Sequence, residues 1–303
     1  MRSFSSLIQK AQKGTSKPRM VITPAHDVRI LSLLPEIITM TKPVLIGRAK
    51  QIQEQLINCG VNVSGFEILD EQDESTAITT AVELVHSNKV EILMQGSVDN
   101  TLFSQMVFDR KKGIGATSIL SHISMLEHSK EGKCCMITDT LINKAPTLRQ
   151  KIAILENALV VAKALGIKRP KVAALAALEY VNPSIQSTLD AAVLSKMGDR
   201  HQFGDAIVGG PLDIDCAVSR EASKRKRVSS KVTSDVDIYL VCDVESGYSF
   251  AEFLSLLGRM EMAGIIVGGQ SPVIPNRACT TRKAKIAEVA LACLLSKGRQ
   301  NDV

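Results

Sequence analysis

Asn276 and Arg277 form the residue pair with the clearest potential for chemistry. They follow a Gly-Gly loop at 268–269 and a Ser-Pro turn at 271–272. A guanidinium group in such a loop can bind a phosphate through paired hydrogen bonds or stabilise an oxyanion that develops during a reaction. The pair therefore predicts an anion-binding site, and Arg277 is the residue that we would first assign to chemistry.

A second candidate site follows the apolar run that ends at Ile207-Val208. We interpret Gly209-Gly210-Pro211 as a turn between this buried strand and a helix whose start carries Asp213 and Asp215. Glycine lets a ligand approach the backbone closely, and the unpaired N–H groups of a helix N-terminus favour an anion. Turns of this kind occur throughout α/β proteins, so this one predicts a ligand only in combination with other motifs.

Two further turns carry polar side chains. Gln95, Gly96 and Thr101 lie in a segment of small residues, amides and hydroxyls that could hold a carbonyl or phosphate oxygen, although an ordinary strand-to-helix connection fits equally well. Asp139 and Asn143 flank a loop before a long helical pattern, where polar side chains often only cap the next element. Both turns therefore stay open between a binding role and a structural one.

Ser121 and His122 are adjacent in an apolar strand pattern. A single histidine in a strand is more often a core or junction residue than a catalytic base. Since no second histidine and carboxylate occur at the spacing of a catalytic triad, hydrolysis by a serine–histidine pair is not predicted. The run Lys224–Arg227 is interpreted as a solvated helix C-terminus rather than as a nucleic-acid patch.

Composition narrows the class of protein. The chain of 303 residues has 37 basic and 31 acidic side chains, a net charge of +6 that mildly favours anionic substrates such as phosphates or coenzyme A. Aromatic residues make up 3% and tryptophan is absent, so the stacking platform of single-strand nucleic-acid binders is missing. The seven cysteines are odd in number and lack Cys-x-x-Cys spacing, which predicts free thiols and no metal site. Without a signal peptide or a membrane-spanning run, a soluble cytoplasmic protein is expected.

Short apolar strands alternate with helical patterns, which predicts a parallel sheet covered on both faces. The expected strands lie at 20–23, 43–47, 66–69, 90–94, 118–126, 133–138, 171–178, 204–208, 236–241 and 264–267. The expected helices include 28–40, 48–59, 74–87, 147–165 with Thr147 as N-cap, 186–196, 214–226, 249–263 and 281–295. The strands at 118–126 and 133–138 are consecutive and are expected to be antiparallel. Because ligands bind at the carboxyl ends of parallel strands, Thr23–Asp27, Gln95–Thr101 and Gly209–Asp215 are placed on the functional side.

Taken together and in order, these segments resemble the phosphate acetyl/butyryltransferase family over residues 15–295. The resemblance depends on Leu120-Ser-His-Ile, Ile137-Thr-Asp139, Asn157-Ala-Leu, Pro170-Lys-Val-Ala-Ala-Leu-Ala-Ala-Leu-Glu179, Gly210-Pro-Leu-Asp-Ile-Asp215, Asp235-Val-Asp-Ile, Asp243-Val-Glu-Ser-Gly247 and Gly268-Gly269 with Arg277. No single motif is diagnostic, but their order and spacing are specific. The compact length and the Leu-Ser-His motif look closer to butyryltransferases than to acetyltransferases.

The resemblance implies an α/β fold with two domains, a three-layer architecture of parallel or mixed sheets similar to isocitrate and isopropylmalate dehydrogenases, and an active site in the interdomain cleft. Residues 1–138 with 270–303 would form the first domain and 139–269 the second. The implied reaction transfers a short acyl group, butyryl or acetyl, between coenzyme A (CoA) and inorganic phosphate, giving acyl phosphate and CoA. CoA is then a substrate, no cofactor or metal is expected, and a homodimer or larger homo-oligomer is expected to bind neither nucleic acid nor membrane.

The resemblance also implies roles for particular residues. Arg277 and Asn276 would be the catalytic pair, with Arg277 holding the phosphate or the tetrahedral oxyanion. The residues expected to line the substrate cleft are Gln95, Gly96, Thr101, Ser121, His122, Asp139, Asn143, Gly210, Pro211, Asp215 and Gly269.

The sequence departs from the family pattern at several positions. The family usually has Lys at Gln95, Ser at Asn276, Arg near Gly115, Asn at Tyr248, Lys at Glu252 and Asp near Cys279. The candidates to replace the lost positive charge are Arg110, Lys111, Lys112, Arg282 and Lys283. Because losing several charge-assisted contacts could abolish activity, the alternative function is a regulatory relative that binds CoA or an acyl ligand without turnover. Metal-dependent dehydrogenation of a hydroxy acid ranks last, since Asp213 and Asp215 alone do not make a divalent-cation site.

Overall fold

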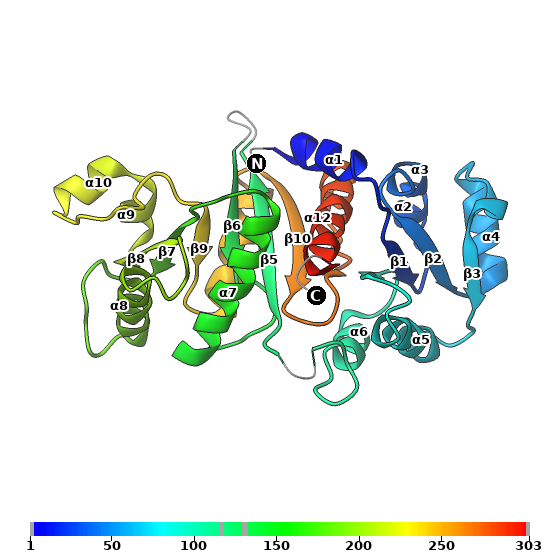
Figure 1. The fold of residues 1–303 in the computed structure, drawn as a ribbon, viewed down its shortest axis with the longest axis horizontal. Coiled ribbons are helices and arrows are strands. Elements are labelled where there is room, and N and C mark those ends of the chain that lie inside the picture. The colour runs from blue at the N-terminus through cyan, green and yellow to red at the C-terminus, as the bar shows by residue number, and fades with distance from the viewer. Residues whose placement is uncertain (1–2, 116–117, 129–132, 301–303) are drawn as a thin grey trace. The chain divides into compact units, whose positions relative to one another are not determined.

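The computed structural model describes residues 3–115, 118–128 and 133–300. Packing divides the chain into two compact units (Figure 1). Phe4–Leu120 with Ala263–Val303 form what we call the first unit, and Met1–Ser3 with Ser121–Met262 form the second unit. The domain division expected above, 1–138 with 270–303 against 139–269, remains a prediction.

The sheet of the first unit has the strand order β3-β2-β1-β4-β11-β10. Its strands are β1 (Arg19–Thr23), β2 (Lys42–Gly47), β3 (Glu67–Asp70), β4 (Ile92–Gln95), β10 (Glu261–Val267) and β11 (Val273–Ile274). All neighbours pair in parallel except β10, which is antiparallel to β11. The register joins Thr23 to Gln95 and Met94 to Ile274, so β1, β4 and β11 end at the same edge of the sheet.

The central strands of this sheet are buried along most of their length, as expected for parallel strands covered on both faces. The helices around them are α1 (Phe4–Gln12), α2 (Val28–Leu31), α3 (Leu34–Ile37), α4 (Ala49–Asn58), α5 (Glu74–His86), α6 (Asn100–Val107) and α12 (Arg282–Gln300), with a short 3-10 helix, η1, at Val63–Gly65. Aspartates cap three of the helices: Asp27 accepts from the Arg29 N–H at 2.9 Å, Asp73 from the Thr76 N–H at 2.9 Å, and Asp99 from the Thr101 N–H at 2.9 Å.

The sheet of the second unit has the strand order β5-β6-β9-β7-β8. Its strands are β5 (Ser121–Glu127), β6 (Cys134–Thr138), β7 (Lys171–Leu175), β8 (Ile207–Leu212) and β9 (Ile238–Leu240). The antiparallel pairing expected for the two consecutive strands is confirmed by β5 and β6, and the remaining pairs are parallel. The mixed α/β architecture expected from the sequence is therefore present.

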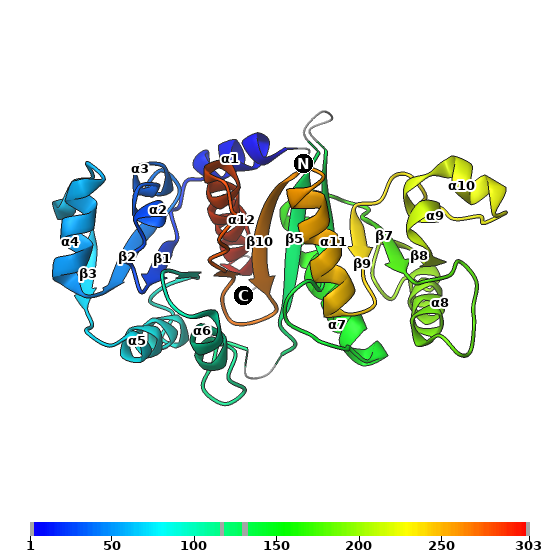
Figure 2. The same cartoon turned by 180° about the vertical axis from the view of Figure 1, so that it is seen from behind.

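Helices cover both faces of the strands of the second unit. They are α7 (Leu148–Ala164), α8 (Gln186–Asp199), α9 (Ile214–Val218), α10 (Arg220–Arg225) and α11 (Val244–Leu256). Helix α7 lies over β5 and β6 on one face (Figure 1), and α11 lies over the same strands on the other face (Figure 2). The expected N-cap of α7 is confirmed, since Thr147 and Gln150 form a reciprocal capping box.

The prediction of a glycine turn after Val208 is wrong. Strand β8 continues through Gly209-Gly210-Pro211 to Leu212, with a register shift against β7 at this point. Proline is tolerated there because β8 is the edge strand of its sheet and because the pairing is irregular. Gly210 is required by packing, since a Cβ would lie 2.9 Å from the Ala174 side chain.

Several element boundaries also differ from those expected. The helix predicted at 28–40 is broken into α2 and α3, because Pro35 has no N–H to continue the first helix. The helix predicted at 214–226 is divided at Ser219, which is extended and caps α10 through the Ala222 N–H. The helix predicted to reach 263 ends at Leu256. In the described chain, no helix is long and apolar enough to cross a membrane.

Candidate functional site

The carboxyl edge of the first unit carries a compact polar site. Strands β1, β4 and β11 end there side by side, and the segments that follow them bring Asp27, Gly96 and Asn276 into contact. This is the edge at which parallel α/β sheets bind ligands. Gly96 is necessary for the arrangement, because a Cβ at this position would lie 1.8 Å from the Pro24 carbonyl oxygen.

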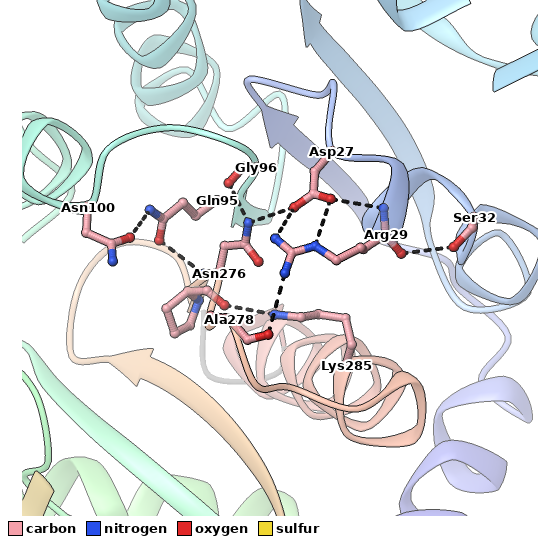
Figure 3. A network of polar contacts seen from close by, with 10 residues as sticks. Asp27, Arg29, Ser32, Gln95, Gly96, Asn100, Asn276, Ala278 and Lys285 are labelled. Atoms are coloured by element: carbon pink, nitrogen blue, oxygen red, sulfur yellow. Dashed lines mark hydrogen bonds and ion pairs between the residues drawn. The ribbon is translucent and has the colours of Figure 1, made fainter. Parts of the chain in front are cut away.

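Asn276 is the centre of the polar network shown in Figure 3. Its side-chain Nδ2 donates to the Gly96 carbonyl oxygen at 2.8 Å and to Asp27 Oδ2 at 3.1 Å. Its backbone N–H donates to Gln95 Oε1 at 3.1 Å, while Gln95 Nε2 donates to Asn100 Oδ1 at 2.8 Å. The Gln95 side chain is thus bonded at both ends of its amide and is 4% exposed. The structure brings together Gln95, Gly96 and Asn276, three of the residues that the sequence analysis named as site candidates.

Asp27 and Arg29 complete this network, and Arg29 was not among the residues expected at a site. The Arg29 guanidinium donates to Asp27 Oδ1 at 3.1 Å and to Oδ2 at 2.8 Å. Burial alone would raise the pKa of Asp27, but the hydrogen bonds from Arg29 and Asn276 outweigh it and hold the pKa below its usual range. The same hydrogen bond and the Asp27 charge raise the pKa of Arg29. Asp27 is therefore a carboxylate that anchors two donors.

A pocket of about 270 Å³ opens beside this network. Its lining includes four basic side chains and three hydroxyl groups, contributed by Arg29, Arg277, Arg282, Lys285, Ser32, Thr280 and Thr281 together with Asn276. Of the described residues that line it, none is acidic. The N-terminus of α12 begins in this lining at Arg282, and a helix N-terminus adds positive potential. We call this feature the anion pocket, because its charge and donors suit a phosphate or carboxylate.

The basic side chains of the anion pocket are balanced by carboxylates behind it. Arg282 pairs with Glu36 at 2.7 Å, and Lys285 pairs with Glu288 at 2.6 Å. Glu288 has no exposed surface, and burial raises its pKa against the opposing effects of Lys285, the Gly264 N–H and Arg277. Lys285 also donates to the Pro275 carbonyl oxygen at 2.9 Å, so it ties α12 to the segment that carries Arg277.

Arg282 and Lys283, two of the candidates to replace the lost positive charge, lie in different surroundings. Arg282 lies in the lining of the anion pocket together with Arg277. Lys283, the next residue, instead lies over the Phe4 ring, 5.8 Å from its centroid.

Thr101 is exposed in the first turn of α6. Gly269 is explained by packing, since a Cβ there would lie 2.9 Å from the Ile114 carbonyl oxygen.

In the second unit, Asp139 organises the loop after β6. Its Oδ1 accepts backbone N–H groups of His122 at 3.1 Å, Leu141 at 2.9 Å and Ile142 at 3.1 Å. Its Oδ2 accepts from the Asn143 backbone N–H at 3.0 Å and from Asn143 Nδ2 at 2.5 Å. These bonds give Asp139 and Asn143 a structural role, which is one of the two interpretations that the sequence left open.

Ser121 and His122 are buried at the start of β5, beside that loop, but they bind different partners. Ser121 Oγ accepts from Asn157 Nδ2 at 3.0 Å, whereas His122 Nδ1 lies 2.6 Å from Thr140 Oγ1. Adjacent strand residues point to opposite faces of a sheet, so the two side chains diverge. This agrees with the expectation that they do not form a hydrolytic pair.

Gly210 and Pro211 lie on the edge strand β8, and Asp215 lies in α9, which follows it. Lys226 is bonded there to Asp213, to Asp215 at 2.9 Å and to Glu179 at 3.7 Å. Burial would raise the pKa of Asp213, but the Lys226 ammonium outweighs it and lowers that pKa. Asp213, Asp215 and Cys216 lie close enough to hold a metal ion, yet the ammonium group already supplies their positive partner. One residue of the basic run Lys224–Arg227 thus has an internal role.

Comparison with known proteins places these features in a family context. A family model described as phosphate acetyl/butaryl transferase matches residues 71–293. The phosphate butyryltransferase of Clostridium acetobutylicum is 33% identical over 298 residues, which cover 98% of this chain and 99% of that protein. The phosphate acetyltransferase of Rickettsia felis is 35% identical, covering 97% of this chain and 84% of that protein. The crystal structure of a branched-chain phosphotransacylase from Enterococcus faecalis superposes with a TM-score of 0.78 at 26% identity, covering 92% of this chain and 99% of the other.

Proposed function

Because the chain belongs to the phosphate acetyl/butyryltransferase family, we propose that it transfers a short acyl group, butyryl or acetyl, between CoA and inorganic phosphate. In one direction the substrates are acyl-CoA and phosphate, and the products are acyl phosphate and free CoA. CoA acts as a substrate, and the proposed reaction needs no further cofactor. The comparisons favour this activity over a regulatory relative without turnover.

The observation that carries the proposal within this chain is the anion pocket. Arg277 shares it with three other basic side chains, and hydroxyl groups and the N-terminus of α12 add further donors. Charge-assisted hydrogen bonds to phosphate oxygens are about twice as strong as neutral ones. The pocket therefore provides positive charge of the kind that the departures from the family pattern at Gln95, Gly115 and Glu252 remove.

The proposed chemistry is a direct displacement. A phosphate oxygen attacks the thioester carbonyl carbon, a tetrahedral oxyanion forms, and the C–S bond then breaks to release CoA as thiolate or thiol. The guanidinium of Arg277 would hold the phosphate and stabilise the oxyanion. Most of the rate enhancement then comes from proximity and from charge that is already in place.

We also propose the finer architecture that the family resemblance implies. It has two domains of the isocitrate/isopropylmalate dehydrogenase type, with the active site in the cleft between them, and it forms a homodimer or larger assembly in the cytoplasm. Asn276 would act beside Arg277. The remaining residues proposed to line that cleft are Gln95, Gly96, Thr101, Ser121, His122, Asp139, Asn143, Gly210, Pro211, Asp215 and Gly269. Their support is the family pattern.

An acyl-exchange assay tests the function. The purified chain is incubated with butyryl-CoA or acetyl-CoA, and release of the CoA thiol is followed with and without inorganic phosphate. We expect phosphate-dependent release, and a loss in kcat/KM of at least about 100-fold in Arg277→Ala, the effect of removing one preorganised donor from an oxyanion. Arg200→Ala, which removes an exposed arginine in the second unit, is the matched control. Folded wild-type protein without phosphate-dependent release from either thioester would refute the function.

A further inference from the structure

We propose that Asn276 and Gln95 are positioning residues that act as one latch, fixing the backbone on which Arg277 projects into the anion pocket. The inference rests on the proposed function only in taking phosphate as the anion that Arg277 binds. Asn276 and Gln95 both depart from the family pattern. The inference gives them one shared role, which depends on the hydrogen-bonding groups of asparagine and glutamine.

Segment 275–278, which carries Arg277, is held by several other parts of the first unit (Figure 3). Lys285 from α12 donates to the Pro275 carbonyl oxygen at 2.9 Å. Arg29, from the segment after β1, donates to the Ala278 carbonyl oxygen at 3.5 Å. Between these attachments, the Asn276 backbone is bonded to Gln95, the last residue of β4, and its side chain is bonded to Gly96 after β4 and to Asp27 after β1. Arg277 is therefore preceded and followed by anchored backbone.

Asn276 suits its place because it must donate twice. Its partners, the Asp27 carboxylate and the Gly96 carbonyl, are both acceptors, and the amide NH₂ group supplies two hydrogens. A serine hydroxyl, usual at this position in the family pattern, has one hydrogen and so could satisfy only one of the two. An aspartate would offer no donor and would add charge beside Asp27.

Gln95 suits its place because it must accept and donate. Its Oε1 accepts the Asn276 N–H, and its Nε2 donates to Asn100. A lysine, usual at this position in the family pattern, has only donors and could not accept that N–H. Since the Asn276 side chain bonds to Gly96, the residue next to Gln95, the two departures belong to one set of contacts. The lysine charge is lost, and a fixed backbone for Arg277 is gained.

A fixed backbone matters for binding because ordering a loop at the moment of binding weakens affinity. With the latch intact, the Arg277 backbone needs little rearrangement to meet an anion. Without it, part of the binding free energy is spent on ordering segment 275–278. The latch thus acts on phosphate only through Arg277, and that dependence can be measured.

A double-mutant cycle on phosphate binding tests the latch without requiring turnover. The dissociation constant of inorganic phosphate is measured by calorimetry for the wild type, Asn276→Ser, Gln95→Met, Arg277→Ala and each latch variant combined with Arg277→Ala. We expect each latch variant to weaken binding about fivefold when Arg277 is present, the factor that the net contribution of one typical hydrogen bond carries. In the Arg277→Ala background the same changes should matter less than about twofold, because coupled residues are not additive.

Controls separate the latch from general destabilisation. Gln53→Met removes an exposed amide on α4 and should leave phosphate affinity unchanged. Three results would each overturn the latch. The latch variants could lose the same factor of phosphate affinity with and without Arg277, they could lose no phosphate affinity at all, or the wild type could fail to bind phosphate. If the cycle behaves as expected but the wild type releases no CoA, the acyl-transfer function fails and the latch stands. If CoA is released and Asn276→Ser keeps the wild-type KM for phosphate, the latch fails and the function stands.

Discussion

The buried ion pair between Lys151 and Asp190 gives a quantitative prediction about stability. Lys151 on α7 and Asp190 on α8 are 2.8 Å apart, with side chains that are 7% and 4% exposed. At an effective dielectric constant of about 20, opposite charges at this distance attract by roughly 6 kcal/mol, and the cost of removing both from water offsets much of that. Removing only one partner leaves the other charge buried and alone. We therefore expect Lys151→Met to lower the free energy of unfolding by about 3–5 kcal/mol.

Urea denaturation followed by circular dichroism measures this loss, and α8 supplies a matched control. Lys196 and Asp199 on that helix are 3.6 Å apart and more than half exposed, so Lys196→Met should cost less than about 1 kcal/mol. The double variant Lys151→Met/Asp190→Leu should recover most of the lost stability, because no lone charge remains and Gln186, which donates to Asp190, is exposed and can bond to water. The reasoning is refuted if Lys151→Met costs no more than Lys196→Met, or if the double variant is less stable than the single one.

Two further predictions concern the backbone of the site and the response to acid. Gly96→Ala should lower the free energy of unfolding by about 1–3 kcal/mol and abolish phosphate binding measured by calorimetry, because the new Cβ would meet the Pro24 carbonyl. Gly65→Ala, with open space around the new Cβ, should change stability by less than about 0.5 kcal/mol, and an equal effect of both changes would contradict the packing argument. Hydrogen bonds from Lys133 and Lys171 lower the pKa of Asp235 from 3.8 to about 2, so this carboxylate stabilises the fold above pH 4 and the contribution is lost as the pH falls through 2. Because Asp235 is 46% exposed, we expect Asp235→Asn to cost only about 1 kcal/mol at pH 6, with the difference from wild type shrinking between pH 4 and pH 2 in urea titrations; a difference that grows in acid would be contrary to this sign.

The strand pattern of this protein could be predicted from its sequence because buried parallel strands are short apolar runs. β1, β2 and β4 were found within one or two residues of their bounds. The single helix expected after β1 is interrupted before Pro35, because periodic apolar residues continue across a proline that the helix itself cannot accommodate. Gly209-Gly210-Pro211 was misinterpreted as a turn because a bulged edge strand uses the same residues as a turn does.

The candidate site was predicted only in part, because most of its contacts join distant parts of the chain. Arg277 and Asn276 were found from local composition, and Gln95 from its position after a strand. Asp27 and Asn276 are separated by 249 positions, and no local pattern links them. Lys226 is a second example. It belongs to a run of basic residues that suggests a solvated helix end, but its ammonium group binds the carboxylates of Glu179, Asp213 and Asp215. Pairings of this kind follow from tertiary structure.

The insertion of the second unit between the two parts of the first has a consequence for biosynthesis. β11 pairs with β4, and the segment that follows β11 forms the anion pocket together with residues 29–33. Those residues are synthesised early in translation. A growing polypeptide therefore has no complete anion pocket until Lys285 has left the ribosome, however early the inserted part folds. Premature termination anywhere before that residue should yield chains that are inert toward phosphate.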